Sequence, residues 1–355
     1  MGLPNIEVVF KALASSAVSR GSQGIVALVL KDSVHAGPNV YTDPKAIPQD
    51  YSTYNLNQIN LAFIGGDQAP VSLIVYVLPT TATDYSAATS YLETVIWDYG
   101  AIPEIDTADA LVVATWIKAL RDSKDIKSKM VLPNTAGDHE GIINFGTDDI
   151  IVASGTVNAT DYCSRIAGIL AGNPLTMSAT FQVLPEVKDV PHLTSTQFDT
   201  NINAGQLLLI NDGEKVKIAR AVNSLVTLTA TKTADWQKCK IVDIMDLQHD
   251  DIKRTFGDNY VGKVPNDYDH KCLLITAINT YLGGLENQML LEIGKNSVGI
   301  DVAAQTSYLQ SKGIDTSGMK ELDIKKANTG SFVFLTGTDR PLDAMEDLTL
   351  NLFLN

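Results

Sequence analysis

Apolar and polar residues alternate near both ends of the chain, and this alternation predicts a β-strand at each end. The alternating apolar positions are Ile6, Val8 and Phe10 near the start and Leu348, Leu350, Leu352 and Leu354 near the finish. Side chains of a strand point to opposite faces in turn, so a period of two indicates a strand with one buried face. We expect each terminal strand to bury its apolar side chains against another strand or sheet.

These terminal strands can be buried in two ways. An unpaired strand edge with apolar side chains is a ready site for pairing with another chain. Both strands could pair within their own domain, or each could extend the sheet edge of another copy. The first arrangement suits an ordinary globular protein, and the second suits a self-assembling building block. The pattern alone leaves both open.

The pattern between the ends predicts an α/β domain over residues 25–200. Residues 11–24 are rich in small and polar residues, which is typical of an extended linker. The apolar runs Ile25–Leu30 and Val71–Leu78 predict buried strands, and residues 32–54 between them are expected to be irregular. Further helices are predicted over 84–99, 107–123 and 161–171, and short strands over 130–132, 142–145 and 150–154. Such alternation of helices and strands is typical of an α/β layer domain.

A second block, residues 201–337, mixes strands and helices as an α+β domain. Residues 206–210 and 216–220 flank the turn signal Asp212-Gly213 and predict a β-hairpin. Helices are predicted over 267–282 and 301–312, and a strand over 332–335. The expected organisation is an N-terminal arm and linker (1–24), an α/β domain (25–200), an α+β domain (201–337) and a C-terminal arm (338–355).

Composition narrows the class of protein. Charged residues make up only 19% of the 355 residues, so much of the surface is uncharged, as in a subunit buried among its own copies. The net charge of -14 and the lack of a Lys/Arg cluster argue against a general nucleic-acid binder. The apolar runs are too short to cross a bilayer, and three scattered cysteines fit free buried thiols in a reducing compartment.

The sequence carries no recognisable motif for a catalytic, cofactor or metal site. The sequence contains no nucleotide-binding loop, nucleophile elbow or zinc-binding His-Glu-x-x-His motif. His139-Glu140 comes nearest, but Ile143 stands where the second histidine is needed. A zinc site from Cys239 and Cys272, with His249 and His270, matches no ligand spacing. We therefore expect no catalytic residue, no cofactor and no metal ligand.

Four segments resemble the contractile tail sheath proteins of phages and phage-tail-like particles. Residues 2–32 resemble the opening arm and first strand of that family. Ala167–Thr180 (AGILAGNPLTMSAT) is similar to its A-G-x-x-A-G helix end, and Ala204–Leu225 (AGQLLLINDGEKVKIARAVNSL) to its hairpin signature. Asp251–Lys263 resembles its D-I-x(n)-Y-V-G-K segment. The length fits the short sheaths of simple contractile tails and R-type bacteriocins, such as clostridial particles.

This resemblance implies a structural, self-assembling subunit. Sheath subunits stack as hexameric rings around a tail tube, and the arms of each subunit extend a β-sheet in the inner domain of its neighbours. It implies assembly in the bacterial host cytoplasm, with the tube, baseplate and tail terminator proteins as partners and neither nucleic acid nor membrane insertion. The hinges would lie at Ser19, Gly21 and Gly24 and at Thr338 and Pro341. Arg220 and Asn223, within the hairpin signature, would have structural roles.

Two other interpretations remain open from the residues alone. One is a cytosolic α/β enzyme of the hydrolase kind, whose terminal strands pair within the same chain. The absence of a recognisable catalytic motif argues against it. The other is a different tail component, such as a tube or baseplate protein, although tube proteins are usually shorter.

Overall fold

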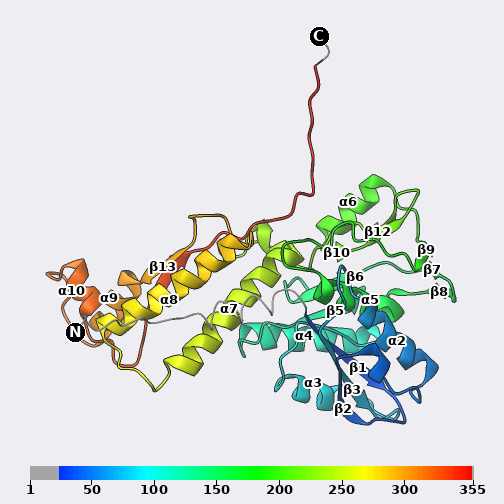
Figure 1. Cartoon of the computed structure of the whole chain (residues 1–355), viewed down its shortest axis with the longest axis horizontal. Coiled ribbons are helices and arrows are strands. Elements are labelled where there is room, and N and C mark those ends of the chain that lie inside the picture. Colours follow the sequence, from blue (N-terminus) through cyan, green and yellow to red (C-terminus); the bar gives the residue numbers. More distant parts are fainter. Residues whose placement is uncertain (1–23, 354–355) are drawn as a thin grey trace, which may run out of the picture. The chain divides into compact units, whose positions relative to one another are not determined.

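The computed structural model describes residues 24–353, which form two compact units (Figure 1). The larger unit contains residues 24–243 together with 343–353, and the smaller unit contains residues 244–342. The division falls inside helix α7 (Cys239–Asn259). The sequence predicts a boundary at residue 200, whereas residues 201–243 lie in the larger unit, where they supply a strand of its central sheet.

A seven-stranded sheet in the order β10-β6-β5-β4-β1-β3-β2 forms the centre of the larger unit. Its strands are β1 (Ile25–Lys31), β2 (Gly37–Tyr41), β3 (Ser72–Leu78), β4 (Tyr99–Ala101), β5 (Lys129–Pro133), β6 (Ile142–Phe145) and β10 (Gln206–Leu207). Only β2 runs antiparallel to its neighbour in this sheet, and the other pairs are parallel.

Helices cover both faces of this sheet, which explains the unbroken apolar run of β1. Val26, Leu28 and Leu30 belong to one buried cluster, and Ala27 and Val29 belong to another. The first cluster includes helices α2 (Thr53–Ile64) and α5 (Ala159–Gly172), and the second includes α3 (Ser86–Leu92) and α4 (Thr107–Asp122). A parallel sheet needs cover on both faces because its crossover helices lie there.

Smaller elements complete the larger unit (Figure 1). They are the sheet of β7 (Ile150–Val152), β8 (Gly155–Val157) and β9 (Val187–Asp189), the hairpin of β11 (Leu209–Asn211) and β12 (Val216–Ile218), helix α6 (Ser195–Asn203), and the 3-10 turns η1 (Pro44–Ala46) and η2 (Ala234–Gln237). The hairpin predicted at Asp212-Gly213 is therefore present, but with shorter strands than expected, because Gln206 and Leu207 pair with β6 in the central sheet.

Close contact with the α2 region explains the Ala-Gly repeat of α5. A Cβ atom on Gly168 would lie 2.1 Å from the carbonyl oxygen of Ala62, and one on Gly172 would lie 2.0 Å from that of Gln68. Only glycine allows backbones to approach so closely. The A-G-x-x-A-G motif is thus a packing motif between α5 and the chain around α2.

The smaller unit consists of helices and one two-stranded antiparallel sheet. After α7 come α8 (Tyr268–Asn287), β13 (Ser297–Ile300), α9 (Val302–Ser311), α10 (Glu321–Lys326) and β14 (Leu335–Thr338). Strands β13 and β14 pair with Val298 opposite Gly337 and Ile300 opposite Leu335. The mixed α/β class expected from the sequence is confirmed.

Several predicted elements differ from the structure. Residues 32–54, expected to be irregular, contain β2, η1 and the start of α2. The helix predicted over 84–99 ends at Leu92, and Tyr99 lies in the central strand β4. The strand predicted over 332–335 lies at 335–338 instead, and α8 continues to Asn287 past Gly283-Gly284. Helix α2 was not expected, because two of its buried positions are polar. Asn55 donates to the carbonyl of Lys31, and Gln58 to that of Asp161.

Candidate functional site at the C-terminal arm

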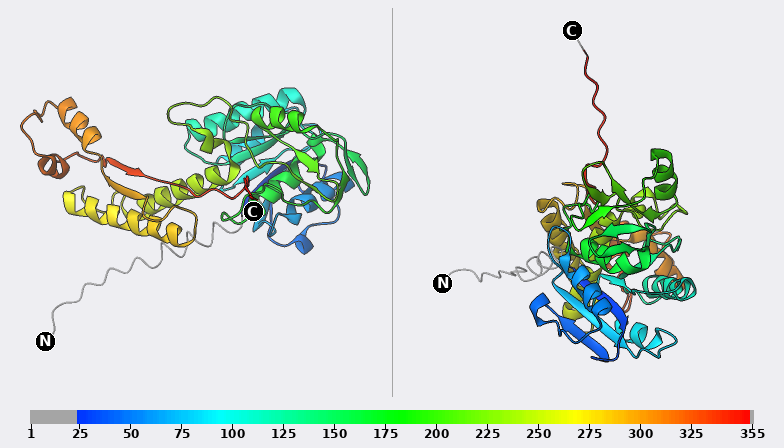
Figure 2. Two further views of the ribbon diagram at one scale, coloured as in Figure 1. Left: turned by 90° about the horizontal axis from the view of Figure 1, so that it is seen from above. Right: turned by 90° about the vertical axis from the view of Figure 1, so that its right-hand side faces the viewer.

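The leucines of the C-terminal arm are exposed rather than buried. Leu348, Leu350 and Leu352 are 88%, 68% and 81% exposed. No strand forms over residues 342–353, so the strand predicted for 347–354 is absent there; Figures 1 and 2 show the arm as an extended trace. Ile6, Val8, Phe10 and Leu354 lie outside the described residues. Monomeric soluble proteins rarely expose contiguous apolar side chains, and such exposure is typical of interaction surfaces.

The base of the arm, residues 343–347, is bound to the larger unit through Glu346. The Glu346 side chain is only 6% exposed. Its Oε1 atom accepts hydrogen bonds from the hydroxyls of Ser178, at 2.9 Å, and Thr180, at 2.6 Å. Its Oε2 atom lies 3.7 Å from Nε of Arg220 and 3.6 Å from Nζ of Lys238. Glu346 thus joins the arm to the segment after α5 and to the residues around the hairpin.

Further ion pairs flank Glu346 on both sides. Arg220 donates to Oδ1 of Asp347 at 2.6 Å, and Lys238 donates to Oδ2 of Asp343. Burial disfavours the charged form of Lys238, but Asp343 and Glu346 outweigh it and raise the pKa of this lysine above its usual value. The arm therefore has a fixed base and an exposed apolar tip.

The sequence pattern indicates the tip of this site but not its base. Glu346 and Lys238 belong to no recognisable motif. Ser178 and Thr180 lie at the end of the Ala167–Thr180 segment, but nothing in that segment indicates a contact with the arm. The acidic residues just before the leucines are the local signal for the base. Asn223 has the structural role expected of it, because its side chain donates to the carbonyl of Trp236 at 2.7 Å and accepts from the backbone of Leu225 at 3.0 Å.

The positions predicted as hinges are held by backbone contacts where the structure describes them. The backbone nitrogen of Gly24 donates to the carbonyl of Ala171 at 2.7 Å. Thr338 is the last residue of β14, opposite Ser297, and Pro341 forms a β-bridge with Leu291. Ser19 and Gly21 lie outside the described residues.

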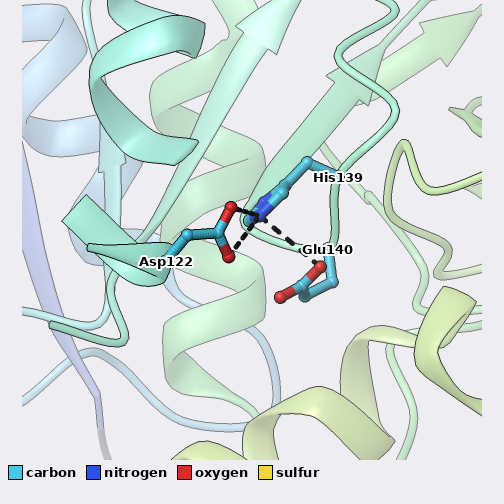
Figure 3. Close-up of side chains that lie close together, drawn as sticks. All are labelled: Asp122, His139 and Glu140. Carbon is cyan, nitrogen blue, oxygen red and sulfur yellow. Dashed lines mark hydrogen bonds and ion pairs between the residues drawn. The ribbon is translucent and has the colours of Figure 1, made fainter. Parts of the chain in front are cut away.

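The histidine and acidic residues singled out near position 139 form a cluster with Asp122 (Figure 3). The ring of His139 accepts a hydrogen bond from the backbone of Gly141 at 3.0 Å, so its other nitrogen donates to Asp122, 3.3 Å away. Glu140 is paired with Lys232 at 2.8 Å and faces Arg121 at 3.7 Å. Two cations beside this carboxylate oppose the binding of a metal ion, so the cluster is a structural network.

The structure of residues 24–353 does not support a zinc site formed by Cys239, Cys272, His249 and His270. Across those residues, the Asp122–His139–Glu140 cluster is the one group whose ligand atoms meet at metal-binding separations. His249 lies 2.9 Å from Asp250, His270 lies 2.7 Å from Asp267, and burial raises the pKa of Cys239. Within the same residues, none of the helices is long and apolar enough to cross a membrane.

Comparison with known proteins places the chain in a family. The model of the phage tail sheath protein central domain matches residues 79–224, and that of the phage tail sheath C-terminal domain matches residues 231–355. The tail sheath protein of Clostridium phage phiCD119 is 38% identical over 355 residues, which cover 99% of each chain. The chain belongs to the phage tail sheath protein family.

Solved structures agree with the fold of a tail sheath protein. The sheath tail protein of Desulfitobacterium hafniense superposes with a TM-score of 0.70 at 18% identity, over 84% of this chain and 93% of that one. The helical sheath of the anti-feeding prophage in its contracted state superposes with a TM-score of 0.70 at 15% identity, over the whole of both chains. The resemblance found in the sequence is confirmed: this tail sheath protein is a structural component of a contractile phage tail or a related particle.

Proposed function

We propose that copies of this tail sheath protein stack as hexameric rings around a tail tube and are joined by exchange of their terminal arms. The observation that carries this proposal is the C-terminal arm, which has a bound base and exposed leucines. Burying one leucine side chain contributes about 1.5–3 kcal/mol. The C-terminal arm of one copy can therefore gain several kcal/mol by adding to a sheet in another.

The acceptor in this proposal is the β13–β14 sheet of a neighbouring copy. A two-stranded sheet is marginally stable alone, and added strands with an apolar face stabilise it. The C-terminal leucines 348, 350, 352 and 354 would add to it from one neighbour. Ile6, Val8 and Phe10 would form a second added strand, which comes from the N-terminal arm of another neighbour.

Contraction would then move whole subunits while the arms keep the lattice connected. We place the C-terminal joint between Leu342 and Asp343, where the chain passes from the smaller unit to the larger one. The N-terminal joint would lie at Ser19 and Gly21, before the held Gly24. The better-packed contracted lattice would drive a tube through the target envelope, as in other bistable assemblies. The tail tube, baseplate and terminator proteins would be its partners, and assembly would take place in the host cytoplasm.

Electron microscopy of the purified protein over a concentration series tests this proposal. The full chain should form hollow, striated cylinders of uniform width. Replacing Leu348, Leu350 and Leu352 with serine should leave folded particles that do not polymerise, because the apolar face of the arm is lost. The matched control replaces Thr349 and Asn351, on the other face of the arm, with serine and should still give cylinders.

Two outcomes would contradict the proposal. Cylinders from the triple-serine variant would show that the leucines do not join the copies. Small particles from the full chain at every concentration, with both termini protected from protease, would show that the terminal strands pair within one chain.

A further inference from the structure

The outer edge of β13 is already occupied by a side chain of helix α8. The side-chain nitrogen of Asn279 donates to the carbonyl of Val298 at 3.0 Å, and the backbone nitrogen of Val298 donates to the side-chain oxygen of Asn279 at 2.7 Å. A side-chain amide carries the same donor and acceptor as a peptide group. Asn279 therefore satisfies at Val298 both groups that a neighbouring strand would otherwise bind.

The same geometry shows which groups of β14 point outward. In an antiparallel pair, residues alternate between bonding across the ladder and pointing away from it. Val298 points away from β14, so its partner Gly337 points away from β13, and by alternation so does Leu335. Among residues 24–353, no backbone hydrogen bond reaches these outward groups of Gly337 and Leu335. Thr336, Gly337 and Thr338 are exposed, so this edge is accessible.

The two faces of the sheet match the two faces of the C-terminal arm. Val298, Ile300 and Leu335 share one face, because Ile300 lies opposite Leu335 and Val298 lies two residues before Ile300. The other face carries the small and polar residues Ser297, Gly299, Thr336 and Thr338. Over residues 348–352 the arm alternates leucine with Thr349 and Asn351. Laid beside β14, its leucines would extend the apolar face and its polar residues the polar face.

We propose that Asn279 closes the β13 edge, so that the C-terminal arm of a second copy adds to the sheet at β14 alone. This inference rests on the proposed arm exchange. It adds which edge of the sheet receives the arm and which residue blocks the other edge. A two-stranded sheet with both outer edges open would accept arms at two places and allow mismatched assembly. With β13 closed, each subunit offers a single edge of this sheet to the C-terminal arm of a neighbour.

Disulfide trapping tests which edge receives the arm. Cys272, the half-buried thiol, is first replaced with serine, while Cys163 and Cys239 stay buried. One set of variants combines Thr336→Cys on β14 with a cysteine at position 349 or 351. The other combines Ser297→Cys on β13 with the same arm cysteines. A disulfide needs Cα atoms within about 7 Å, which adjacent strands satisfy and strands two places apart do not.

Assembled protein is oxidised and run on non-reducing gels. The β14 set should give ladders of covalent oligomers, and the β13 set should stay monomeric. Adding Asn279→Ala to the β13 set should produce ladders there, because the N–H and C=O groups of Val298 then lose their side-chain partner. Asn279→Asp keeps the acceptor for the Val298 nitrogen but loses the donor, so it should give weaker β13 ladders. Thr276→Ala, an exposed position on the same helix, is the control and should give none.

The outcomes separate this inference from the proposed function. Equal ladders from both edges with Asn279 intact would overturn the edge-closing role but keep arm exchange. A β13 set that stays monomeric after Asn279→Ala, in protein that still forms cylinders and β14 ladders, would also overturn it. Cylinders that give no ladder with any cysteine pair would instead refute addition of the C-terminal arm to this sheet.

Discussion

Replacing Glu346 with alanine should release the base of the C-terminal arm from the larger unit. The change removes an acceptor for Ser178 and Thr180 and a buried charge facing Arg220 and Lys238. A hydrogen bond to a charged group contributes about 1.5–3 kcal/mol. Part of this is regained, because Ser178 and Thr180 still bond each other at 3.0 Å. Arg220 and Lys238 also keep Asp347 and Asp343 as partners. The net loss should be about 2–3 kcal/mol.

This loss of free energy should raise the fraction of molecules whose arm base has detached from the larger unit. The increase should be about 30- to 150-fold, since about 1.4 kcal/mol changes an equilibrium tenfold. Thermolysin reports it through cleavage between Ala344 and Met345, because cutting needs several residues to leave the surface. When opening is fast relative to cleavage, the rate follows the open population. Mass spectrometry separates this cut from cuts in the exposed tip. Glu346→Gln, which removes only the charge, should give a smaller increase.

The matched control is Glu93→Ala in the same unit. Glu93 accepts from Lys124 at 2.6 Å and from Trp116 at 2.9 Å, so a comparable acidic network is lost far along the sequence from the arm. Cleavage at Ala344 should not change in this variant. Equal cleavage rates in the original protein and in Glu346→Ala would refute the claim that Glu346 holds the arm.

Three further changes test the packing of the larger unit. Gly168→Ala should lower the free energy of unfolding by about 1–3 kcal/mol through its clash with Ala62, whereas Gly283→Ala, with open space around it, should not. Asp243→Asn should cost about 3 kcal/mol, measured by urea unfolding, because Asp243 pairs with a lysine on β5 whose side chain is 3% exposed. Burial lowers the pKa of His139, so the unfolded chain takes up this proton first and stability falls as pH drops below about 6.5. In His139→Gln the slope of unfolding free energy between pH 7 and 5 should be smaller, and an unchanged slope would contradict this.

Elements with a strong local pattern were predictable from the sequence. Helix α4 begins at Thr107, as predicted, and α8 begins one residue after the predicted start at Asp267. Asp106 and Asp267 cap these helices, and a cap depends only on neighbouring residues. Strands β1 and β3 were recognised as buried from their apolar runs. Helix α2 was missed, because Asn55 and Gln58 occupy buried positions that only their hydrogen bonds to distant segments make acceptable.

The sequence by itself determined the alternation of the terminal arm, the α/β class and the resemblance to tail sheath proteins, since each depends on residues close together in the chain. Only the tertiary structure revealed the base of the arm, where Glu346 meets Ser178 and Thr180 more than 160 residues away. It also decided that the predicted hinges Thr338 and Pro341 lie in paired backbone, and that Asn279 fills one edge of a sheet. These features depend on contacts between residues far apart in the chain, and local patterns carry no record of which distant groups will meet.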